Sequence, residues 1–204
     1  MFLSWLALAE VPESVRPIAA PSYAADDYGH WAASRRKDEL LCDKVVADIL
    51  VCFQVDQQER RRWVGTADLG DWKVTRAEFL ATMRRRAEAA VTVVKQESDG
   101  VAYWIHEGET RWSAGTLLRP DLVSKALDRS AFHLVVPLEH TVLFWPEGGT
   151  EQDQIMGVGA VEMTERQAGA VSGTILRWSQ GGFSIYAQAV AEEPRAPAPS
   201  KATP

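Results

Sequence analysis

The sequence is poor in cysteine and carries no short motif that marks a metal site. Its two cysteines, Cys42 and Cys52, are too few for a disulfide framework in 204 residues, and no C-x-x-C pair occurs. Cys52 lies in an apolar run and is predicted to be a small core residue, and the two thiols can pair only if the intervening chain folds back. None of the four histidines stands in H-E-x-x-H or another short metal-binding spacing. We therefore expect neither a metal nor a cofactor.

Common catalytic signatures are missing as well. The closest approach to a nucleophile elbow, residues 169–173, has its serine one place too late for G-x-S-x-G. Neither a phosphate-binding loop nor a G-x-G-x-x-G fingerprint after a strand is present. These absences count against the enzymes that use such motifs without excluding them, and they favour a protein that is not an enzyme.

Long apolar runs are absent too. No stretch approaches the roughly 20 apolar residues that a membrane span needs. The start of the chain, Met1–Ala9, lacks a positive region and is followed at once by Glu10. Its large apolar residues fall on one face of a short helix, which favours a docking helix over a signal sequence. We expect a cytoplasmic protein that does not bind membranes.

The composition itself is that of an ordinary globular protein. Hydrophobic residues make up 46% of the chain and charged residues 25%, and the formal net charge is −6. An acidic balance argues against nucleic acid as a partner, because nucleic-acid-binding domains are usually basic. The length fits one domain with appendages.

The pattern along the chain predicts three regions. Residues 1–30 contain a short N-terminal helix and a proline-containing irregular connector, residues 31–189 form a single α+β domain, and residues 190–204 form a flexible tail rich in proline and alanine. Hairpins dominate the middle region without a regular βαβ alternation, so the sheet is predicted to be mainly antiparallel, with two or three packed helices.

The strongest local signal is a T-x-x-E capping box at Thr75–Glu78, which begins a predicted helix over residues 76–94. Further helices are predicted over residues 120–128 and 152–170. Strands are predicted from alternating or continuous apolar residues at 46–56, 62–66, 101–106 (with a hairpin that returns to Trp112), 132–137, 141–145, 174–179 and 183–188.

Few residues qualify as candidates for chemistry. His133 lies in an apolar strand and is predicted to be a hydrogen-bonded core histidine. Glu139 and His140 occupy a turn between two buried strands, from which side chains can reach a cleft, although any hairpin needs a polar turn. They are the only catalytic candidates, and arginines such as Arg84 could face them.

Two arginine triplets stand out: Arg60, Arg61 and Arg62, and Arg84, Arg85 and Arg86. Residues 57–95 carry nine Lys and Arg against five Asp and Glu, inside an acidic chain. A solvated surface is the simpler interpretation, and a patch for an acidic partner, a phosphate or RNA is the sharper one. Consecutive helical residues point in different directions, so one helical triplet cannot converge on one site.

The chain also has eight tryptophans, which is many for its length. Most are predicted to pack in the core or on sheet faces, and a few are expected to be exposed, as aromatic residues often are at protein interfaces.

The order of several apolar segments resembles the bacterial YtpQ-like family. The segments are Asp48–Phe53, Val74–Glu78, Gly115–Leu118, Leu134–Pro137, Val142–Trp145 and Ser172–Gly182, so that the resemblance spans roughly residues 43–186. The family carries an arginine–aspartate pair in the turn after the proline, whereas this chain has Leu138, Glu139 and His140 there. The resemblance implies an α+β fold and a bacterial cytoplasmic setting, and it supplies neither an activity nor site residues.

Three functions follow from the sequence as hypotheses. The first is a non-catalytic domain that binds another protein as an adaptor or regulator. The second is an enzyme or ligand-binding domain with a pocket near Glu139 and His140, which a cleft with carboxylates of perturbed pKa would favour. The third is an anion or RNA site on the arginine-rich segment 60–86, which predicts binding that weakens steeply with salt.

Overall fold

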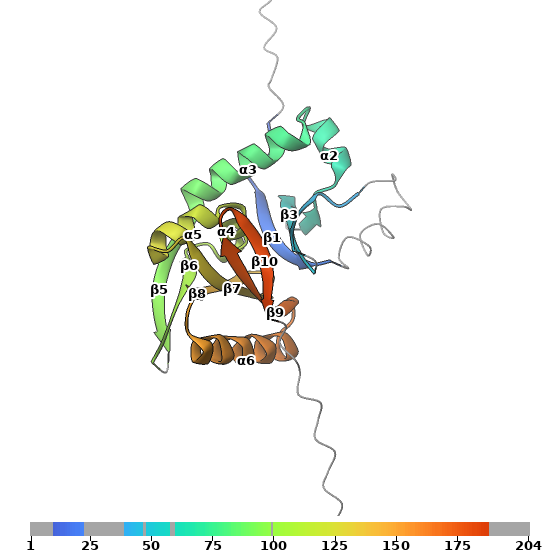
Figure 1. The fold of residues 1–204 in the computed structure, drawn as a ribbon. Coiled ribbons are helices and arrows are strands. Elements are labelled where there is room, and N and C mark those ends of the chain that lie inside the picture. The colour runs from blue at the N-terminus through green and yellow to red at the C-terminus, as the bar shows by residue number, and fades with distance from the viewer. Residues whose placement is uncertain (1–9, 23–38, 47, 58–59, 99, 188–204) are drawn as a thin grey trace, which may run out of the picture.

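The computed structural model describes residues 10–22, 39–46, 48–57, 60–98 and 100–187 (Figure 1). These residues form two antiparallel sheets and a set of helices, which confirms the predicted α+β fold with mainly antiparallel strands. The predicted N-terminal helix and the predicted tail lie outside the described residues.

The smaller sheet is built around β3 (Ile49–Gln57). One side of β3 pairs with β1 (Val15–Pro21), and the other side pairs with β2 (Cys42–Val46) and then with β4 (Arg60–Trp63). Alternating side chains of β3 such as Val51 and Phe53 face the core, as the sequence predicts.

The presence of β1 corrects the prediction of an irregular connector over residues 11–30. Val15, Ile18, Ala19 and Ala20 are buried, so this segment belongs to the folded body. Its prolines suggested a break, but β1 pairs with β3 alone among the described strands. An edge strand tolerates proline because the missing N–H faces away from its neighbour.

The larger sheet has six strands in the order β10-β9-β7-β8-β6-β5, all antiparallel. It contains three hairpins of consecutive strands. The strands are β5 (Thr92–Ser98), β6 (Val101–Glu107), β7 (Ala131–Leu138), β8 (Thr141–Pro146), β9 (Ala170–Ser179) and β10 (Gly182–Ala187). The β7–β8 and β9–β10 hairpins confirm the predicted ones.

Helices connect and cover the sheets. Helix α3 (Arg76–Ala90) begins at Thr75, whose hydroxyl accepts a hydrogen bond from the Glu78 N–H, as the capping box predicts. Helix α5 (Pro120–Leu127) begins with proline in its first turn. The remaining helical segments are α2 (Thr66–Asp71), η1 (Thr110–Trp112), α4 (Gly115–Leu118) and α6 (Thr150–Arg166).

Two predicted elements differ from the structure at neighbouring places. Helix α3 ends at Ala90, because Val91, Thr92 and Val93 are β-branched, and the chain continues from Thr92 as β5. Consequently β6 pairs with β5, and the predicted hairpin to Trp112 does not form. The segment after β6 turns into η1 and brings Arg111 toward the small sheet.

The main core lies between the small sheet, helices α3–α5 and one face of the large sheet. Phe53 and Phe79 meet edge to face there with ring centroids 4.8 Å apart. Helix α6 covers the opposite face of the large sheet (Figure 1). Its Gly157 lies against Ile175, where a Cβ atom would be 3.2 Å from the isoleucine, so a glycine that weakens the helix permits close packing.

Cys42 and Cys52 form a disulfide between the paired strands β2 and β3. The hairpin folds the chain back and places the two cysteines directly opposite each other, with Cα atoms 4.0 Å apart. Cys52 is buried as predicted, but it is a bonded half-cystine rather than a free core residue.

No helix among the described residues is long and apolar enough to cross a membrane.

Candidate functional site

A groove of about 330 Å³ lies where β2, α3 and α4 approach the turn between β9 and β10. We call it the inter-sheet groove, because strands of both sheets border it. Its apolar lining consists mainly of Val45, Leu117, Leu118, Pro120, Trp178 and Phe183. Charged side chains and backbone contribute a similar share of its lining, and a concave surface of this size that combines apolar and polar groups can serve as a binding site.

Aromatic rings form one wall of the inter-sheet groove. Trp178 and Phe183 are half-buried on neighbouring strands, with ring centroids 4.7 Å apart and planes inclined at 56°. Behind them Phe132 stacks on Trp178 at 6.4 Å and anchors this wall in the core. Rigid half-buried rings present apolar area without a large loss of side-chain entropy on binding.

Charged side chains lie at the rim of the groove. Arg84 of α3 donates a hydrogen bond to the Asp43 carboxylate at 3.2 Å, and Lys44 is exposed beside them. The charges that line the groove therefore sum to +1 in a chain whose formal net charge is −6. This favours a ligand with at least one negative charge.

The groove also lies between two open sheet edges. Among the described residues, β2 pairs only with β3 and β10 pairs only with β9. The two edge strands contact each other without hydrogen-bonding as neighbours in a sheet. On the β2 edge the Cys42 carbonyl already accepts a hydrogen bond from Arg76. An extended chain can pair with the remaining outward backbone groups of such an edge.

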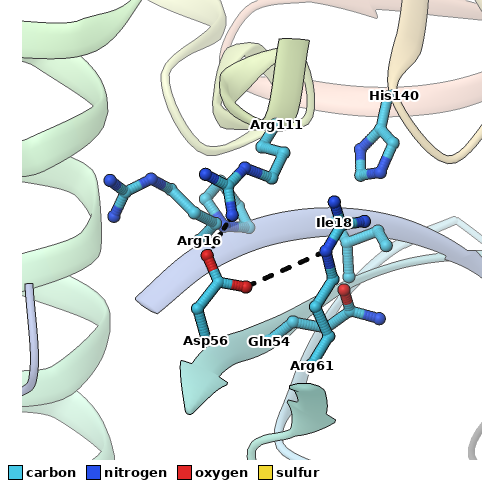
Figure 2. A pocket seen from close by; sticks show the side chains of 8 residues that line it. Arg16, Ile18, Gln54, Asp56, Arg61, Arg111 and His140 are labelled. Carbon is cyan, nitrogen blue, oxygen red and sulfur yellow. Dashed lines mark hydrogen bonds and ion pairs between the residues drawn. The ribbon is translucent and has the colours of Figure 1, made fainter. Parts of the chain in front are cut away.

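A second, much smaller pocket contains His140. Figure 2 shows it between β1, β3, β4, η1 and the β7–β8 turn, where Arg16, Asp56, Arg61, Arg111 and His140 converge. Its accessible volume is about 10 Å³, which is room for about one water molecule. We call it the His140 pocket.

Carboxylates partly neutralise the arginines of the His140 pocket. Asp56 pairs with Arg111 and, at 3.8 Å, with Arg61, while Glu109 pairs with Arg111 at 2.7 Å and Arg16 at 3.3 Å. Three guanidinium groups face two carboxylates in this network. The hydrogen bonds that Arg111 donates, first to Asp56 and then to Glu109, raise the pKa of Arg111 above its usual range.

The surroundings of His140 favour the neutral form of its imidazole. Burial lowers its pKa below the ordinary value, and the charges of Arg61 and Arg111 lower it further, while Glu139 acts in the opposite direction. Its Nδ1 atom is buried and has no hydrogen-bond partner among the described residues. Glu139 does not line the pocket, and its backbone instead bonds to Ala19 and Gly169.

A buried polar cluster joins α6 to the large sheet. The Asp153 carboxylate accepts hydrogen bonds from the Nδ1 atom of His133 at 2.7 Å and from the Trp145 indole at 2.6 Å. The ring of Tyr186 lies 4.0 Å from that of His133. This confirms His133 as a hydrogen-bonded core histidine, and it assigns the cluster a packing role.

The two arginine triplets do not form one surface. Arg61 enters the His140 pocket, and Arg62 forms a two-pronged ion pair with Asp68, at 2.7 and 2.8 Å. Arg84 lies at the inter-sheet groove and does not line the His140 pocket, so it does not face the turn as expected. Of the rest, Arg60 belongs to β4, Arg85 is exposed, and Arg86 bonds to the carbonyls of Val11 and Pro12.

The structure describes six of the eight tryptophans, and none of these six is exposed. Trp112 and Trp145 are buried, and the other four are half-buried. The large exposed apolar side chains are instead Ile155 and Val158 of α6, and Ile185 and Tyr186 of β10. Of the half-buried tryptophans, Trp178 lines the inter-sheet groove.

Sequence reasoning missed Arg16 and Arg111 as neighbours of His140. Arg16 lay in the expected connector and Arg111 in the expected hairpin, so neither could be assigned to the pocket. The spacing of Arg16 and Ile18 could have indicated β1, because residues two positions apart lie on the same side of a strand.

Comparisons of the chain with protein-family models, with curated proteins and with solved structures found no match. The resemblance to the YtpQ-like family therefore stays a prediction. Within the described ranges, no group of three or more His, Cys, Asp and Glu side chains is arranged to hold a metal ion.

Proposed function

We propose that this chain is a non-catalytic adaptor or regulatory domain that binds an extended segment of a partner protein in the inter-sheet groove. The observation that carries the proposal is the position of this groove between β2 and β10, which are edge strands of their sheets within the described part of the chain. A segment lying there gains backbone hydrogen bonds from an edge and inserts an apolar side chain against Trp178 and Phe183.

The lining of the groove determines the chemistry of the segment. Alternate side chains of an extended chain point to opposite faces, so one set can enter the groove while the other stays in water. The apolar wall selects a large aliphatic or aromatic side chain, and the net positive rim with Lys44 and Arg84 selects an acidic residue beside it. The partner is therefore expected to present an extended apolar–acidic segment.

A cytoplasmic, bacterial setting belongs to the same proposal and rests on the sequence alone. The Cys42–Cys52 disulfide is of a kind usually found in oxidising compartments, so the redox state of this pair bears directly on the setting.

A peptide-display selection against the full chain tests the proposal. We expect the selected peptides to share one bulky apolar residue next to an acidic one. Phe183→Arg and the charge reversal Lys44→Glu should each weaken binding of such a peptide about tenfold or more. Ile155→Arg is the matched control, because Ile155 is 46% exposed on α6 and lies outside the groove. Peptides that bind all four proteins equally would overturn the proposal.

A further inference from the structure

We propose that the His140 pocket is a separate binding site for a small oxyanion, such as a phosphate or carboxylate group, held between Arg61, Arg111 and His140. The site does not depend on the inter-sheet groove. Its residues come from β4, η1 and the β7–β8 turn, and they converge only through the fold (Figure 2).

The charges of the pocket leave room for an anion. Arg16 from β1, Arg61 and Arg111 face Asp56 from β3 and Glu109, so these arginines exceed the carboxylates that pair with them by one. Glu139 lies outside the pocket lining, and its charge acts on His140. The Arg61 nitrogen lies 3.8 Å from Asp56, which is too far for a good hydrogen bond. The Arg61 side chain is 57% exposed, so an anion can reach it from solvent. Arginine suits such a role because its planar donors match carboxylate and phosphate oxygens.

The imidazole of His140 supplies a further donor. Its buried Nδ1 atom has no partner within the described part of the chain, and an unpaired buried polar atom costs about 1–3 kcal/mol. An anion oxygen in the pocket would accept a hydrogen bond from this nitrogen when it is protonated. The same anion would offset the charges of Arg61 and Arg111, which now disfavour the imidazolium form.

The size of the pocket limits the ligand to a terminal group. A volume of about 10 Å³ admits roughly one oxygen atom, so the remainder of the anion lies at the mouth beside Arg61. A phosphate or carboxylate at the end of a larger molecule satisfies this geometry as well as a free ion does.

Histidine NMR of the full chain tests the site. We expect sulfate, whose charge is constant between pH 5 and 8, to raise the pKa of His140 at constant ionic strength set with chloride. At pH 7, inorganic phosphate should shift the His140 ring signals in a saturable way. Arg61→Ala should weaken this binding about tenfold or more, as expected for loss of a charge-assisted hydrogen bond.

Arg85→Ala is the matched control, because Arg85 is exposed on α3 and lies outside the pocket. Phosphoserine in parallel distinguishes the source of the group. Tighter binding than that of inorganic phosphate indicates a phosphate ester on a larger molecule, and weaker binding indicates a free anion. An unchanged pKa of His140 with sulfate would overturn the inference, as would equal effects of Arg61→Ala and Arg85→Ala.

Discussion

The Asp153 carboxylate accepts a hydrogen bond from His133 across the interface between α6 and the large sheet, with 2.7 Å between Oδ1 and Nδ1. The same oxygen accepts the indole N–H of Trp145. Both partners are almost fully buried, so the removal of the carboxylate leaves two polar groups without water or protein to bind. This cluster, rather than the apolar face of α6 alone, fixes the helix on the sheet.

We predict that Asp153→Ala lowers the free energy of unfolding by about 3 kcal/mol, as expected when a buried pair loses one member. Asp153→Asn should cost less, because its amide oxygen can still accept a hydrogen bond from Trp145. The charge of Asp153 and a hydrogen bond to it raise the pKa of Tyr186, so Asp153→Asn should also lower that pKa toward its ordinary value.

Denaturant unfolding and spectrophotometric tyrosine titration measure these two effects. Glu162→Ala, in an exposed part of the same helix, is the control and should change stability by less than about 0.5 kcal/mol. Equal stabilities of Asp153→Ala and Glu162→Ala would contradict a structural role for the cluster.

His140 makes stability depend on pH. Its folded-state pKa lies below the ordinary value of 6.5, so as the pH falls the unfolded chain takes up this proton first. The contribution of the neutral imidazole is complete above pH 6.5 and is lost as the pH falls through the folded-state pKa. We expect His140→Gln to lose less stability between pH 7 and pH 5 than the natural chain, as measured by denaturant unfolding. Parallel losses in the two proteins would argue against this assignment.

The Cys42–Cys52 disulfide should make the stability of the chain depend on its redox state. The closed loop is short, with a sequence separation of 10, and its reduction should cost about 2–3 kcal/mol of stability. Unfolding with and without reductant measures this cost, and Cys42→Ser with Cys52→Ser should match the reduced protein. Thiol counting on protein from its native cell distinguishes the setting. Two free thiols agree with a cytoplasmic location, and none indicates an oxidising compartment.

The parts of the fold that were predicted correctly depend on local chemistry. The capping box at Thr75 is complete within four residues. The β9–β10 hairpin is predicted by a glycine turn between two strands with alternating apolar residues. Strand β1 was missed because its prolines look like a break until the edge position of the strand is known. The end of α3 was placed too late, because Val94 continues the helical spacing although it lies in a strand.

The candidate sites could be predicted only in part, because each joins segments distant in sequence. His140 was selected from its turn, but its neighbours Arg16 and Arg61 lie in β1 and β4, far from it in the sequence. The inter-sheet groove joins Lys44 to Phe183, and nothing local in either segment indicates the other. The disulfide likewise required the register of β2 on β3, which places Cys42 opposite Cys52.

The most direct test of the central claim is an amide NMR titration of the full chain with a peptide from the display selection. We predict shifts at both borders of the groove, at Lys44 in β2 and at Phe183 in β10, and none at Lys95 in β5, the opposite edge of the large sheet. Shifts confined to α6 or β5, with the groove amides unchanged, would contradict binding in the inter-sheet groove.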